Sequence, residues 1–305
     1  LIGYLPDINK IGLLIRPLTN WITGLRIFKL IIGFAPERNI PKLSKISLRK
    51  WYRTPRKVAD SKRKVYLFAD EFTNFNESHI GIKAIMLLNQ LGYEVVIPKH
   101  RESGRTFLSK GLLKKARQIA IQNVERLSEI ISDETPLIGI EPSAILTFRD
   151  EYPEIVGNQM KDKAYKLAQN TFMFDEFLIN EVEKGHIPGN RFTSERKVIR
   201  LHGHCQQKAV ASTLSTKKML ELPVNYTVYE IKSGCCGMAG SFGYEKEHYA
   251  LSQQIGEMIL FPEVRKSSPD EIIVAPGTSC RHHIEETTGR KVLHPVEVLW
   301  EASLK

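Results

Sequence analysis

The stretch VNYTVYEIKSGCCGMAGSFGYEKE, residues 224–247, decides the fold, because a strand-like run there enters a glycine-rich loop and a helical pattern follows. β-Branched and aromatic residues dominate residues 224–231, which predicts a buried strand. Four glycines let the loop backbone turn tightly and approach a ligand closely. Cys235 and Cys236 lie in this loop, and they are two of only four cysteines in 305 residues.

The same order of elements continues on both sides of this loop. Residues 196–205 predict a strand running into a loop, and residues 209–220 predict a helix. Downstream, a helix over residues 246–260 precedes a strand and loop over residues 270–280. Strands that alternate with helices favour a parallel sheet.

The first half of the chain repeats this order without cysteines. Residues 64–70, 94–98 and 136–144 predict strands, with a helix between the first two and a longer helix over residues 110–132. Gly104 matches Gly237, and the next matching loop follows 40 residues later in the first copy and 43 in the second. Where the second copy has Cys235, Cys236 and Cys280, the first has Glu102, Ser103 and Ala144.

We therefore expect an α/β fold of two tandem, duplicated βαβ-type units with parallel sheets and a helical connector. The expected divisions are an N-terminal helical segment (1–57), a first repeat without cysteines (58–160), the helical connector (161–196) and a second repeat with the site (197–305).

Every cysteine lies in a loop after a predicted strand. Such loops gather at one edge of a parallel sheet, so the thiols should converge on one metal. A histidine three residues after the last cysteine has metal-ligand reach from the same helical turn. His202 and His204 flank the first cysteine, and for His202 and His282 a capping or core role stays open beside ligation. The candidate metal and cofactor ligands are Cys205, Cys235, Cys236, Cys280 and His283. Zinc competes with an iron–sulfur cluster for such a site.

Composition limits the function classes. The net charge is +10, but the basic residues are scattered, which argues against a nucleic-acid partner. Few cysteines in a chain of this size exclude a secreted disulfide scaffold and favour a reducing compartment, so we expect a cytoplasmic protein. Residues 11–34 are apolar but too interrupted to span a bilayer; they form a helix packed on the protein itself, on a missing domain or on the inner membrane. Because the chain begins at Leu1, we expect a fragment.

Three stretches resemble the cysteine-rich CCG domain of iron–sulfur oxidoreductases: HGHCQQKAV, SGCCGMAGSFGYEKEHYALSQQIGE and APGTSCRHHIEETTGRKVLHPVEVL. This family includes the B subunit of heterodisulfide reductase, the iron–sulfur subunit of glycolate oxidase and the C-terminal part of FAD-linked D-2-hydroxyacid dehydrogenases. The resemblance extends through DEFTNF, GRTFLSKGLL and IEPSAILTFRDEY in the first copy, and covers about residues 58–299.

The resemblance implies an oxidoreductase part that transfers electrons through an iron–sulfur cluster of the 4Fe-4S type, held by the four cysteines. It implies FAD in a missing oxidase domain or subunit, a 2-hydroxyacid substrate such as D-lactate, glycolate or D-2-hydroxyglutarate, and a quinone or soluble carrier as acceptor. The isolated chain should not oxidise substrate, and no catalytic side chain is expected in it. The family's fullest pattern ends in CxxC, whereas this chain has His283 at the last position.

Two other functions stay open. One is a zinc-stabilised module that docks a catalytic partner. The other is a thiol–disulfide reductase that uses Cys235 and Cys236, because thiolates near helix starts can have a lowered pKa.

Overall fold

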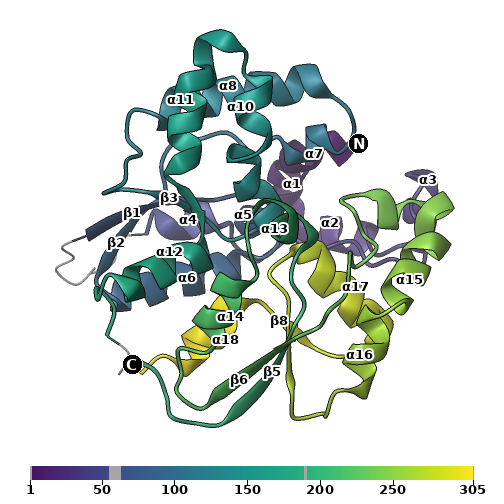
Figure 1. The fold of residues 1–305 in the computed structure, drawn as a ribbon. Coiled ribbons are helices and arrows are strands. Elements are labelled where there is room, and N and C mark those ends of the chain that lie inside the picture. The colour runs from purple at the N-terminus through teal and green to yellow at the C-terminus, as the bar shows by residue number, and fades with distance from the viewer. Residues whose placement is uncertain (1, 55–62, 189–190, 305) are drawn as a thin grey trace.

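The computed structural model describes residues 2–54, 63–188 and 191–304, and it contains two four-stranded sheets covered by helices (Figure 1). The strand order is β2-β1-β3-β4 in the first sheet and β6-β5-β7-β8 in the second. Every pairing in both sheets is parallel. The α/β fold is confirmed, and the matching strand orders fit two tandem units.

The strands are short, and each ends at a loop on the carboxyl edge of its sheet. The first sheet contains β1 (Arg63–Phe68), β2 (Tyr93–Val96), β3 (Leu137–Gly139) and β4 (Thr171–Met173). The second contains β5 (Lys197–Leu201), β6 (Tyr226–Glu230), β7 (Ile272–Val274) and β8 (Val292–Leu293). The expected helical connector, residues 161–196, thus also supplies a strand, because β4 pairs with β3.

Helices follow almost every strand. In the first half they are α5 (Glu71–Phe75), α6 (Ser78–Gln90), α7 (Arg105–Leu108), α8 (Leu113–Leu127), α9 (Pro142–Ile145), α10 (Glu151–Ile155), α11 (Asn158–Gln169) and α12 (Phe174–Glu183). In the second half they are α13 (Cys205–Val210), α14 (Leu214–Leu220), α15 (Tyr249–Glu257), α16 (Leu260–Lys266), α17 (Thr278–Thr288) and α18 (Pro295–Ala302).

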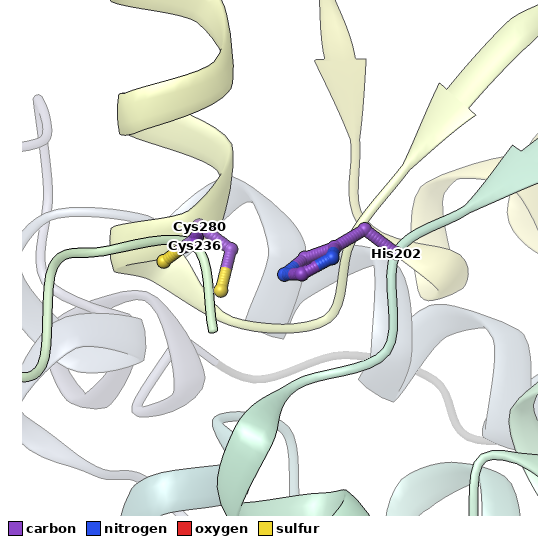
Figure 2. Close-up of side chains that lie close together, drawn as sticks. All are labelled: His202, Cys236 and Cys280. Atoms are coloured by element: carbon purple, nitrogen blue, oxygen red, sulfur yellow. The ribbon is translucent and has the colours of Figure 1, made fainter. Parts of the chain in front are cut away.

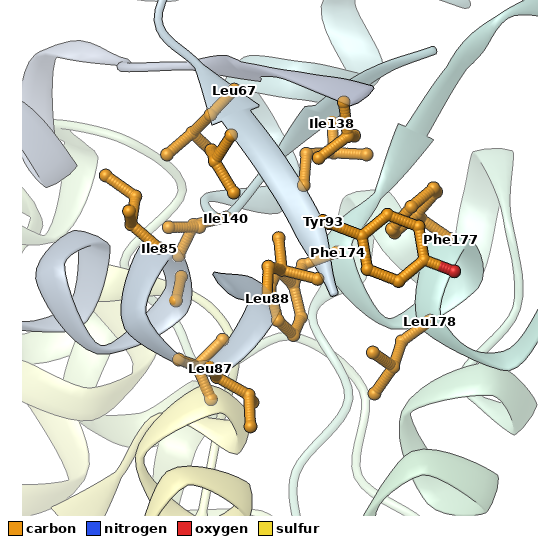
Figure 3. Close-up of a cluster of buried hydrophobic side chains, with 14 of the residues drawn as sticks. Leu67, Ile85, Leu87, Leu88, Tyr93, Ile138, Ile140, Phe174, Phe177 and Leu178 are labelled. Atoms are coloured by element: carbon orange, nitrogen blue, oxygen red, sulfur yellow. The ribbon is translucent and has the colours of Figure 1, made fainter. Parts of the chain in front are cut away.

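The two halves share a hydrophobic core. Leu67, Leu88 and Phe174 of the first half lie in the largest buried cluster, part of which Figure 3 shows. Val296 and Leu299 of α18 belong to the same cluster and are fully buried. Burying a leucine contributes about 1.5–3 kcal/mol, so this shared core ties the halves together.

The N-terminal segment contains α1 (Leu5–Gly12), α2 (Arg16–Ile22), α3 (Arg26–Ile31) and α4 (Leu48–Tyr52). The first three helices and the 3-10 turn between α1 and α2 leave many apolar side chains exposed: Ile8, Ile11, Leu14, Ile15, Leu18, Trp21, Ile27, Leu30 and Ile31. In the part of the chain that the structure describes, none of the helices has the length and apolar character to cross a membrane. The expected boundary at residues 57 and 58 lies outside the described residues.

Candidate metal centre

The four cysteines come together at the carboxyl edge of the second sheet. Cys205 starts α13 directly after β5, the vicinal pair follows β6, and Cys280 lies in the first turn of α17 after β7. Each thiol influences the next electrostatically, from Cys205 through Cys235 and Cys236 to Cys280. Cys236 and Cys280 belong to a group of potential ligand atoms that all lie within 4.8 Å of one another, whereas Cys205 and Cys235 lie outside that group. The strand–loop pattern therefore brings the cysteines to one sheet edge, and their ligation of a single metal stays a prediction.

His202, for which the sequence left a capping or core role open beside metal ligation, lies in a group with Cys236 and Cys280. Its ring nitrogen and the sulfurs of Cys236 and Cys280 all lie within 4.8 Å of one another, and all three residues are buried (Figure 2). His202 Nδ1 lies 2.8 Å from Ser233 Oγ. Nε2 is buried and has no hydrogen-bond partner among the described residues. With the proton on Nδ1, Nε2 presents a lone pair, as a metal ligand must.

His283, the predicted histidine ligand, also has an Nε2 that is buried without a hydrogen-bond partner among the described residues. It is fully buried, but it lies outside the set of His202, Cys236 and Cys280. Its Nδ1 lies 2.8 Å from Cys236 O, and since a carbonyl only accepts, Nδ1 carries the proton. Burial, followed by the charge of Arg38, lowers the pKa of His283 to about 4, so the ring is neutral at pH 7. His283 holds the backbone of the cysteine loop, and its ligation of a metal stays a prediction.

The thiols alternate in acidity in the order Cys205, Cys235, Cys236 and Cys280. Hydrogen bonds from neighbouring thiols lower the pKa of Cys235 and of Cys280 below the usual value. The same hydrogen bonds raise the pKa of Cys205 and Cys236, the donors, with burial adding to the effect. Cys235 also accepts a bond from Gly237 N at 3.3 Å. Thiolates are the form that binds metals, and Cys235 and Cys280 are the two thiols whose pKa is lowered.

Some glycines near the sulfurs are required because a Cβ there would meet a neighbouring atom, and others are not. Gly237 has φ +96°, and a Cβ there would lie under 3.0 Å from the Ser252 carbonyl oxygen. A Cβ on Gly277 would lie 3.3 Å from Cys280 Sγ. Gly234, by contrast, has nothing within 4 Å of such a Cβ. Only some of the loop glycines are required by close approach.

The N-terminal segment around Ala35 and Arg38, called the strap, contacts the loop and helices next to the vicinal cysteines. Arg38 is fully buried, and its guanidinium donates to Gly243 O at 2.6 Å and to Ser252 Oγ at 2.8 Å. The same group pairs with Glu286 of α17 at 2.7 Å. Ala35 N donates to Tyr244 O at 2.9 Å. Because these contacts join partners more than 200 residues apart in the sequence, no local pattern indicated them.

The first half has no thiols at the matching place, and a hydrogen-bonded carboxylate lies there. Glu71 accepts from Ser103 Oγ at 2.6 Å and from Ser103 N at 3.1 Å. Glu141 reaches the second half and accepts from Thr278 N, at the start of α17, at 2.8 Å. Glu77 pairs with Arg281 of the same helix at 2.6 Å. The first half thus supports the helix that carries Cys280.

No known protein-family profile matches the chain. Over 293 residues it is 29% identical to the C subunit of anaerobic glycerol-3-phosphate dehydrogenase from Escherichia coli (strain K12), and the match covers 94% of this chain and 72% of that protein. It is 26% identical over 240 residues to D-2-hydroxyglutarate dehydrogenase of Pantoea ananatis (strain AJ13355), covering 78% of this chain and 22% of that protein.

A third relative, lactate utilization protein A of Bacillus subtilis (strain 168), is 26% identical over 251 residues, or 77% of this chain and 98% of that protein. The chain thus spans about a fifth of the D-2-hydroxyglutarate dehydrogenase and most of the other two relatives. These relatives are a dehydrogenase, a component of another dehydrogenase and a lactate utilization protein. The expectation of an oxidoreductase, or part of one, is confirmed.

Proposed function

We propose that this chain is the electron-transfer module of a larger dehydrogenase, and that it binds an iron–sulfur cluster through Cys205, Cys235, Cys236 and Cys280. The observation that carries the proposal is the gathering of four thiols from three separate strand ends at one edge of the second sheet, where Cys236 and Cys280 are buried, Cys235 is half-buried and Cys205 is exposed. Free cysteines can pack as small hydrophobic side chains, but packing alone gives no reason for all four to follow the strand ends of one sheet.

The residues present fit a metal group. His202 Nε2 is buried without a partner in the described chain, and it faces two thiols. Gly277 lets the His204 ring pack close to the backbone beside Cys280, because a Cβ at Gly277 would collide with that ring and lie 3.3 Å from Cys280 Sγ. Thiolate and imidazole donors are those that iron–sulfur clusters and zinc prefer. When bound, an iron–sulfur cluster supplies a one-electron redox centre whose potential depends on burial and on hydrogen bonds to sulfur.

The protein's own residues set the environment of that centre. Gly237 N donates to Cys235 Sγ, and such donors stabilise negative charge on sulfur. His283 fixes the Cys236 carbonyl. His202 is the candidate nitrogen donor, and imidazole in place of thiolate raises the potential of related clusters. The site is deep on the Cys236 and Cys280 side and open on the side of Cys205, which is exposed.

The relatives suggest the wider reaction. Two of them are named for the oxidation of glycerol-3-phosphate and of D-2-hydroxyglutarate, in both of which a secondary alcohol loses two electrons and two protons. We infer that a partner protein or domain with FAD oxidises a substrate of the 2-hydroxyacid type. The chain then passes the electrons singly toward a quinone or a soluble carrier.

The N-terminal helices favour contact with the cytoplasmic face of a membrane. Their exposed side chains include Leu14 at 84%, Ile31 at 77% and Ile27 at 68%. Between residues 8 and 36 every ionisable side chain is a lysine or an arginine, four in all. Exposed apolar side chains with cationic neighbours are typical of helices that lie in the interface of anionic membranes.

Anaerobic purification with metal and sulfide analysis tests the function. The expected result is iron and acid-labile sulfide in equal amounts, with an electron paramagnetic resonance signal after dithionite reduction. Cys280→Ser should lose the signal, and Ser103→Ala, the matched change in the first half, should keep it. One zinc and no iron would favour the docking module, and disulfide reduction by metal-free protein would favour the thiol enzyme; either result would overturn the proposal.

A further inference from the structure

A cavity of about 570 Å³ lies outside the cysteine site, where the N-terminal helices meet α17 and β8. Its wall includes Thr23 and Gly24 from the turn between α2 and α3, His79 at the start of α6, and Arg281 on α17. No function described above uses this cavity.

Three lysines line the cavity without a carboxylate partner. Among the described residues, no acidic oxygen lies within ion-pair distance of Lys29, Lys42 or Lys291, each of which lines the wall. Lys29 is only 4% exposed, and its ammonium donates to a single acceptor, Pro36 O, at 3.2 Å. An ammonium has three hydrogens, so most of the donor capacity of Lys29 remains for a ligand.

The acidic residues of the wall are already engaged. Glu77 pairs with Arg281, and although burial opposes ionisation, the charge of Arg281 outweighs it and lowers the pKa of Glu77. Glu297 pairs with Lys83 at 3.0 Å. Glu285 accepts from Val292 N at 2.9 Å. Counted over the wall, the side chains of Lys29, Lys42, Lys291 and Arg281 face those of Glu77, Glu285 and Glu297, which leaves one positive charge in excess, and a buried ammonium without a counter-charge is costly.

The helices on either side of the turn that lines the cavity carry exposed apolar side chains. The turn that supplies Thr23 and Gly24 connects α2 and α3, which present Trp21 at 62% and Ile27 at 68% exposure on either side. A ligand that fits both features has an anionic oxygen-rich group for the lysines and an apolar chain for the helices. We propose that this cavity binds the phosphate headgroup of an anionic phospholipid, whose acyl chains lie over α2 and α3.

This inference rests on the membrane contact proposed above and adds a specific lipid site to it. The lysines donate charge-assisted hydrogen bonds to the phosphate oxygens, and the apolar face takes up the chains. Basic helices could also be attracted to a charged membrane surface without any cavity. The test therefore uses a lipid in monomeric form, so that no membrane surface is present.

The experiment measures binding of monomeric dihexanoyl phosphatidylglycerol, below its critical micelle concentration, by calorimetry. Dihexanoyl phosphatidylcholine and inorganic phosphate are the comparison ligands. The expected result is that phosphatidylglycerol binds roughly tenfold tighter than either, as one lost charge-assisted contact would give. Lys42→Gln with Lys291→Gln should remove this preference, since both lysines are exposed enough for the fold to tolerate the change.

The matched control is Lys10→Gln with Arg26→Gln, which removes the same charge from α1 and α3 outside the cavity wall. This control should keep the preference for phosphatidylglycerol. Equal losses in both double variants, or inorganic phosphate binding as tightly as the lipid, would overturn the lipid site. A separate arm with phosphatidylcholine–phosphatidylglycerol vesicles reports the membrane contact itself, so that vesicle binding without monomer binding refutes only the cavity.

Discussion

Replacing Gly237 by alanine should damage the cysteine loop more than any other single methyl group added there. Gly237 has φ +96°, a backbone conformation that costs an L-residue about 1–2 kcal/mol. Its new Cβ would collide with Ser252 O, a backbone atom of α15 that cannot rotate away. Overpacking of this kind costs about 1–3 kcal/mol, so the total loss is about 2–5 kcal/mol.

Gly234→Ala is the matched control, because the same methyl group is added three residues earlier in the same loop. Nothing lies within 4 Å of a Cβ at Gly234. Its effect on the free energy of unfolding should stay within about 1 kcal/mol and can be stabilising.

Urea unfolding of both variants, with iron quantified in anaerobically purified protein, measures the effect. Gly237→Ala should lower the unfolding midpoint and lose most of its iron, since Gly237 N also donates to Cys235 Sγ. Unchanged stability and iron content in Gly237→Ala, or equal losses in both variants, would refute the reasoning.

Three further changes probe the site and its surroundings. Cys235→Ser should abolish metal binding, whereas Glu102→Gln at the matching place in the first half should leave metal content unchanged; metal analysis distinguishes them. Arg38→Met removes three donated hydrogen bonds and leaves Glu286 without its cation. The free energy of unfolding in urea should fall by about 3 kcal/mol, and the electron paramagnetic resonance spectrum of the bound cluster should shift. An unshifted spectrum would refute the positioning role of Arg38. Burial and then the charge of Glu71 raise the pKa of Asp70 to about 8. The protonated side chain therefore contributes its full stability below about pH 4, and this contribution is lost as the pH rises through 8. Asp70→Asn should flatten the decline of the unfolding free energy over this range, and a variant profile parallel to that of the unmodified protein would count against the reasoning.

The parallel sheets and the convergence of the thiols follow from patterns that the sequence contains. Period and spacing place a cysteine at the carboxyl end of β5, β6 and β7, and parallel pairing then brings those ends to one edge. The segment 161–196 was less predictable. The three residues of β4 are too few to show a strand period, so its helices alone were expected.

The parts of the site that were missed depend on contacts between distant residues. His202 directly follows a short strand run, and only the position of Ser233 orients its ring. The strap through Arg38 depends on partners such as Gly243, far along the chain, which no periodicity relates to it. His283 shares a helical turn with Cys280, as expected, and its Nδ1 donates to a backbone carbonyl while its Nε2 has no partner among the described residues.

The backbone N–H of Thr278 donates a hydrogen bond to a carboxylate of the first half, Glu141. After a gene duplication, a copy that has lost its own ligands is usually free to drift or to be deleted. Here deletion would leave the first turn of α17 without an acceptor and Arg281 without its counter-ion. Glu141 and Glu77 therefore help to position the helix that carries Cys280 from outside the cysteine group, so that the half without cysteines supports the candidate metal site of the other.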